Sequence, residues 1–76
     1  MIKVHLSRLL GERKMKQSEL SRKANVRANT ISDLYRERAT AVSFINLEAI
    51  CRVLNCDISE LLEMCPNEQE PERGNK

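Results

Sequence analysis

The chain has 76 residues, of which 41% are hydrophobic, with one Phe, one Tyr and no Trp. A chain of this length folds as one small domain with an aliphatic core and leaves little room for an enzyme cleft. Its net charge of +2 is divided unevenly, because residues 1–38 carry +6 and residues 39–76 carry −4. The basic half predicts a surface for a polyanion, and an unevenly charged but merely solvated surface is the alternative.

The pattern of apolar residues predicts an all-α fold. There are only two glycines and no long alternating run of β-branched residues. No apolar run is long enough to span a bilayer, and the first residues lack the apolar stretch of a secretory signal. We therefore expect a cytoplasmic protein without a membrane partner.

Residues 3–14 are expected to form the first helix. Leu6, Leu9 and Leu10 recur at the three- and four-residue spacing of a buried helical face. A second helix is predicted over residues 17–24, although the residue before it, a lysine, is a poor N-terminal cap.

Residues 17–36 have the pattern of a helix-turn-helix. Leu20 and Ala24 are four residues apart, and Ile31 and Leu34 are three apart. This spacing predicts two short amphipathic helices, 17–24 and 28–36, joined by a sharp turn. At the break, Asn25 is well suited to the left-handed conformation that the turn requires. A small residue, Ser21, lies on the inner face where the helices cross.

A connection over residues 37–43 leads to a fourth helix over residues 44–54. Ser43 is expected to cap this helix, and Asn55 is expected to end it in a left-handed conformation. The predicted buried stripe consists of Leu47, Ile50, Cys51 and Leu54.

A fifth helix is predicted to begin at a capping box formed by Asp57 and Glu60 and to reach about Met64. The domain is therefore expected to cover residues 1–66. Residues 67–76 have no apolar side chain to bury, and we expect them to form a disordered polar tail.

Three cysteines, Cys51, Cys56 and Cys65, raise the question of a disulfide or a metal site. An odd number argues against a disulfide framework. Neither a C-x-x-C spacing nor a histidine close in sequence completes a zinc site, since His5 is remote. We expect no metal and no cofactor, and we expect Cys51 to be a small core residue.

The chain resembles the Cro/repressor-type, or Xre-like, helix-turn-helix family, in its subgroup of short single-domain regulators. The resemblance rests on Met15–Leu20, Ala24–Val26, Asn29–Tyr35 and the stretch from Phe44 to Leu62. It covers residues 6–64 and implies the family's five-helix, lambda-repressor-like fold together with DNA binding.

The resemblance also implies which side chains contact DNA. Asparagine can bond adenine bidentately, arginine can bond guanine, aspartate can accept from cytosine N4, and alanine can contact only a thymine methyl. For the arginine that ends the third helix, charge compensation at the helix terminus is the alternative role. The base-facing residues are Arg27, Ala28, Asn29 and Asp33, and the phosphate-contacting residues are Gln17, Thr30, Arg36 and Arg38. A minor-groove contact is the alternative for Arg36 and Arg38, and Gln17 is otherwise only an exposed residue at the start of its helix.

We therefore expect a sequence-specific transcriptional repressor that inserts the third helix, residues 28–36, into the major groove of double-stranded DNA. A homodimer on a short inverted repeat would gain both affinity and specificity. Helix five and the segment Met64–Pro66 would supply its contact, or would only close the core. The alternative is a protein-interaction module, such as an antitoxin or adaptor, that docks through the acidic half. An enzyme has little support, and no small-molecule effector is evident.

Overall fold

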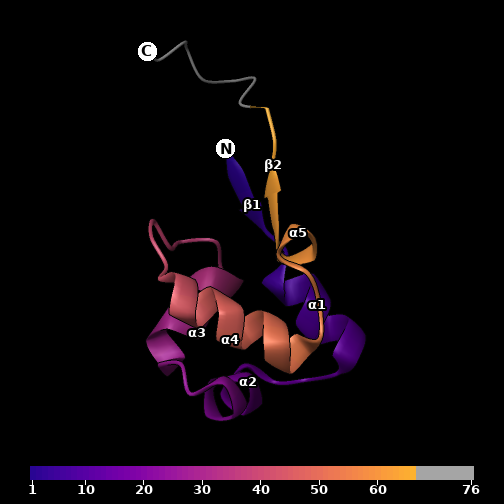
Figure 1. Ribbon diagram of the computed structural model, residues 1–76, viewed down its shortest axis with the longest axis vertical. Helices are drawn as coiled ribbons and strands as arrows, with labels where there is room; N and C mark the ends of the chain where they lie inside the picture. The colour runs from indigo at the N-terminus through magenta and orange to yellow at the C-terminus, as the bar shows by residue number, and fades with distance from the viewer. Residues whose placement is uncertain (67–76) are drawn as a thin grey trace.

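The structure is a computed structural model that describes residues 1–66, so the predicted tail over residues 67–76 lies outside the described residues. Five helices pack together and a two-stranded ribbon projects from one end (Figure 1). The expected five-helix, all-α architecture is confirmed, and the ribbon is an addition to it. The elements are β1 (Ile2–Val4), α1 (Leu6–Arg13), α2 (Gln17–Ala24), α3 (Ala28–Tyr35), α4 (Phe44–Leu54), α5 (Ile58–Leu61) and β2 (Leu62–Met64).

The core is aliphatic, and every helix contributes to it. α2 packs against both α3 and α4, and α4 also contacts α1 and α5. No polar or charged side chain is buried among residues 1–66, and none of the helices described there is long and apolar enough to cross a membrane. The fully buried side chains are Leu6, Leu20, Ile31, Leu34, Ile50, Leu54 and Leu61.

The predicted helix ends are largely confirmed. Asn25 and Asn55 end α2 and α4 with φ angles of 57° and 54°, in the left-handed region that asparagine tolerates better than most residues. The hydroxyl of Ser43 accepts a hydrogen bond from the backbone of Asn46 at 3.1 Å. At the start of α5, the backbone N–H of Asp57 donates to Glu60 Oε1 at 3.0 Å.

The ribbon corrects the prediction at both ends of the chain. Ile2–Val4 is a strand and not the start of the first helix, and the fifth helix ends at Leu61 and not at Met64. β1 and β2 are antiparallel, with Ile2 opposite Met64 and Val4 opposite Leu62. The pairing gives these residues interstrand hydrogen bonds, and it joins segments about sixty positions apart. Helical periodicity within one segment carries no information on such a partner.

Candidate nucleic-acid interface

The turn between α2 and α3 is held by two hydrogen bonds. The hydroxyl of Ser21 donates to the carbonyl of Val26 at 2.6 Å, and the backbone N–H of Val26 donates to the carbonyl of Ser21 at 3.1 Å. Val26 is itself buried. With Asn25 between these two residues in a left-handed conformation, the crossing of α2 and α3 is fixed before any ligand arrives. Ser21 therefore does more than provide the small inner-face side chain that the sequence suggested.

α3 buries one face in the core and exposes the residues at its N-terminal end. Ile31 and Leu34 lie in the core, whereas Arg27, Ala28 and Asn29 are exposed. Because the buried pair fixes the rotation of the helix, these three residues form one exposed edge, with polar side chains at Arg27 and Asn29. The structure places all three predicted base-facing residues of the first turn on one accessible surface.

Three of the predicted residues meet beside the far end of α3. Arg38 Nη2 donates to Asp33 Oδ1 at 3.3 Å, and the backbone N–H of Arg38 donates to the carbonyl of Asp33 at 2.7 Å. Together with Thr30 they line a shallow hollow of about 200 Å³. In the free protein the guanidinium is therefore paired with the carboxylate of α3. This pairing was not anticipated from the sequence, since the two residues are separated by the left-handed turn at Glu37.

The remaining predicted residues lie at helix ends. Gln17 is the first residue of α2 and is half-buried, and the exposed Arg36 follows the last residue of α3. Arg13, the last residue of α1, has a structural role. Its Nε donates to the carbonyl of Leu54 at 2.8 Å, and its Nη1 donates to the carbonyl of Leu9 at 3.3 Å. It ties α1 to the end of α4 and is not a free cation for a phosphate.

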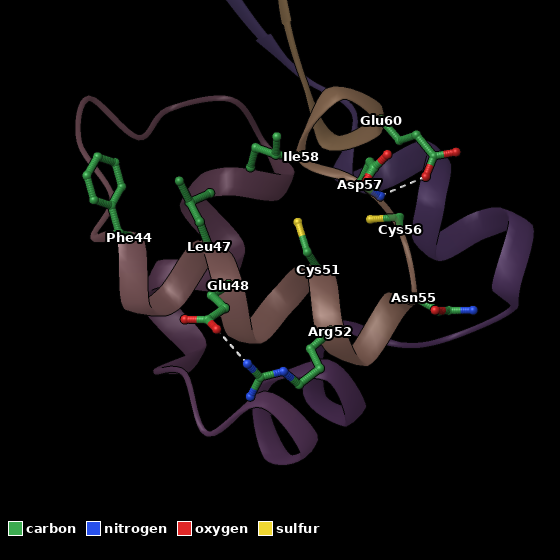
Figure 2. A pocket seen from close by; sticks show the side chains of 10 residues that line it. All are labelled: Phe44, Leu47, Glu48, Cys51, Arg52, Asn55, Cys56, Asp57, Ile58 and Glu60. Carbon is green, nitrogen blue, oxygen red and sulfur yellow. Dashed lines mark hydrogen bonds and ion pairs between the residues drawn. The ribbon is translucent and has the colours of Figure 1, made fainter.

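A groove between α4 and α5 is the surface that the sequence reasoning missed (Figure 2). Its volume is about 800 Å³. The predicted buried stripe of α4 is correct for Ile50 and Leu54, which are buried, but Leu47 and Cys51 are only half-buried and line this groove. The available signal was the spacing of Phe44 from them, which extends the apolar face beyond the core.

The cysteines are all free thiols and all half-buried. Burial, the adjacent Cys51 thiol and the carboxylate of Glu60 raise the pKa of Cys56 to about 11. Cys56 is therefore protonated at neutral pH, and a protonated thiol is a poor nucleophile and metal ligand. Within residues 1–66, no three side chains of the metal-binding types come together.

Comparison with known proteins agrees with this geometry. The model of the Cro/C1-type HTH DNA-binding domain matches residues 5–67. YozG of Bacillus subtilis (strain 168), an HTH-type transcriptional regulator, is 33% identical over 60 residues, which are 79% of this chain and 71% of YozG. The crystal structure of the transcriptional regulator VanUg matches with a TM-score of 0.70 and 33% identity, covering 87% of each chain. The chain belongs to the Cro/C1-type helix-turn-helix family of DNA-binding domains.

Proposed function

We propose that this protein is a cytoplasmic transcriptional repressor that inserts α3 into the major groove of double-stranded DNA, and that its role is binding and not catalysis. The observation that carries this proposal is the exposed edge of Arg27, Ala28 and Asn29, which the Ser21–Val26 hydrogen bonds orient relative to α2. A short helix with such an edge fits the width of the major groove.

Each residue of the edge has a distinct chemical role in this proposal. Arg27 donates two hydrogen bonds to guanine, and Asn29 pairs bidentately with adenine. Ala28 has only a methyl group to offer, so it contacts a thymine methyl. Asp33 accepts from cytosine N4 when Arg38 releases it. The proposal therefore predicts an operator half-site in which the first turn of α3 determines the sequence.

The phosphate contacts are assigned to residues that flank the edge. Gln17 and Thr30 donate hydrogen bonds to phosphate oxygens, and Arg36 and Arg38 supply charge. Because Arg38 is paired with Asp33 in the free protein, it exchanges a carboxylate for a phosphate on binding. That exchange costs little, since an exposed ion pair contributes only about 0–1 kcal/mol.

The proposed active species is a homodimer on an inverted repeat, formed by residues 1–66 without cofactor or small-molecule effector. A single α3 contacts few base pairs, and the second copy multiplies both affinity and discrimination.

Selection of bound sequences from random duplexes, followed by affinity measurements, tests the proposal. We expect Arg27→Ala and Asn29→Ala each to lose about 1–3 kcal/mol of preference for the selected duplex over random DNA. Arg8→Ala is the matched control for Arg27→Ala, because it removes the same charge from α1, where the guanidinium donates to the carbonyl of Glu60. Equal losses on both duplexes would show that the edge contacts only the backbone. Failure to enrich any sequence would contradict specific binding itself.

A further inference from the structure

We propose that Cys51 and Cys56 form a reactive dithiol, which a low-molecular-weight organic disulfide oxidises to one intramolecular disulfide at the C-terminal end of α4. Both thiols are free, and both line the groove between α4 and α5. This modification site lies apart from the proposed DNA-binding edge, because none of the residues that line the groove belongs to α3.

The backbone at the end of α4 brings the two cysteines together. The N–H of Cys56 donates to the carbonyl of Cys51 at 3.0 Å, and the N–H of Asn55 donates to the carbonyl of Arg52 at 3.3 Å. With Asn55 in the left-handed conformation, these two hydrogen bonds make the Schellman motif that ends many helices. The first and last residues of this motif frequently make an apolar contact. In this chain both of those residues are cysteines.

The two thiol groups also point toward each other. Figure 2 shows Cys51 projecting from α4 and Cys56 projecting toward it from the segment that precedes α5. Burial raises the pKa of Cys56 to about 11, and the charge of Cys51 and a hydrogen bond with Cys51 contribute to this rise. Both contributions require the two thiols to be neighbours. A disulfide can form only where two side chains are close and directed at one another, and this pair meets both conditions.

The oxidation proceeds by two thiol–disulfide exchanges. Because Cys56 holds its proton at neutral pH, the thiolate of Cys51 attacks one sulfur of the organic disulfide, forms a mixed disulfide and releases one thiolate. Cys56 then loses its proton to solvent and attacks Cys51 Sγ, which forms the Cys51–Cys56 bond and releases the second organic thiolate. The mixed disulfide leaves no charge on Cys51, so that contribution to the raised pKa of Cys56 is absent in the second exchange. Two protein thiols are oxidised, and one organic disulfide is reduced to two thiols.

Cys65 provides a matched comparison within the same chain. It is also a free, half-buried thiol, but it follows β2 and does not line the groove. Its backbone N–H donates to the carbonyl of Met1 at 2.8 Å, which holds it at the end of the ribbon. A general reactivity of half-buried thiols would therefore include Cys65, whereas the proposed site selects the pair at the end of α4.

Equilibration of the full chain with mixtures of reduced and oxidised glutathione, followed by acid quenching, alkylation and peptide mass mapping, tests the proposal. The equilibrium gives the effective concentration of one protein thiol at the other. We expect one intramolecular disulfide in the wild type and in Cys65→Ser, and only mixed disulfides with glutathione in Cys51→Ser and Cys56→Ser. In denaturing urea the effective concentration for Cys65→Ser should fall by roughly ten-fold or more, because the unfolded chain no longer directs the two thiols at each other.

Urea unfolding of reduced and oxidised Cys65→Ser gives an independent readout. By thermodynamic reciprocity, a fold that favours the disulfide over the unfolded chain is stabilised by the disulfide to the same extent. The oxidised protein should therefore have an unfolding equilibrium constant lower by the same factor of roughly ten or more. Equal effective concentrations in native buffer and in urea would overturn the proposal and leave the two cysteines as an apolar contact at the end of α4. A native disulfide that contains Cys65 would also contradict it.

Discussion

Replacing Asp33 by Asn isolates the ion pair that α3 makes with the residue after its C-terminal turn. In the free protein Arg38 Nη2 lies 3.3 Å from Asp33 Oδ1, and both side chains are exposed. The variant removes the carboxylate, keeps an amide oxygen of the same shape and raises the net charge by one. In the variant, Arg38 can contact a phosphate without first breaking an ion pair with residue 33.

The expected magnitude follows from the release of counterions. In the wild type the carboxylate of Asp33 stays beside the DNA and offsets one positive charge, so its removal steepens the slope of log affinity against log salt by up to about 0.9 on duplex DNA. Between 50 and 200 mM salt, the variant should lose up to roughly three- to four-fold more affinity for random DNA than the wild type does. The free energy of unfolding should change by no more than about 1 kcal/mol, since the pair is exposed.

The assay is a salt titration of both proteins on one random duplex. Glu12→Gln is the control, because it makes the same change of charge beside Arg8 on α1, where the paired atoms are 3.4 Å apart. The control should change the slope by less than half as much as Asp33→Asn. An unchanged slope in Asp33→Asn, or equal changes in the two variants, would refute the phosphate role of Arg38.

Three further predictions concern the stability of the fold. Lys14 follows α1 and has a φ of 52°, in the left-handed region that glycine adopts without strain. Lys14→Gly should therefore raise the free energy of unfolding measured in urea by up to about 1 kcal/mol, and a decrease would contradict strain at this turn. Leu61→Ala should lower the same quantity by about 2–5 kcal/mol because Leu61 is fully buried, and a loss below 1 kcal/mol would show that α5 is not part of the core. The hydrogen bond with His5 Nε2, at 2.6 Å, lowers the pKa of Glu63 from its ordinary 4.5. The carboxylate should therefore stabilise the fold above pH 4.5 and lose this contribution as the pH falls through the lower pKa of the folded state. Glu63→Gln should slightly weaken the dependence of the free energy of unfolding on acidic pH, and identical pH profiles of the two proteins would refute the coupling.

The helical body could be predicted from the sequence because its determinants are local. Leu20, Ala24, Ile31 and Leu34 follow the helical period, and Asn25 marks the turn between them, so α2 and α3 were placed within a residue of their observed ends. The exposed edge of the interface followed from the same periodicity. The residues opposite a buried stripe face solvent.

The features that could not be predicted depend on partners distant in sequence. The ribbon pairs Ile2 with Met64, and Arg13 reaches the carbonyl of Leu54, which ends a helix 41 positions later. The exposure of Phe44 depends on where α5 stops covering α4, and a helical stripe alone does not determine that. Its apolar character was visible in the sequence, but the groove beside it required the packing of two helices.

Titration of the labelled protein with a selected duplex, followed through the backbone amide signals of the non-proline residues, tests DNA binding by α3 most directly. We expect the largest shifts at Arg27–Thr30, with smaller shifts at Gln17, Arg36 and Arg38. On a random duplex the amides of Arg27–Thr30 should shift less than on the selected one, because base contacts are lost while phosphate contacts persist. Shifts confined to the acidic surface of α4 and α5, with Arg27–Thr30 silent, would contradict recognition by α3.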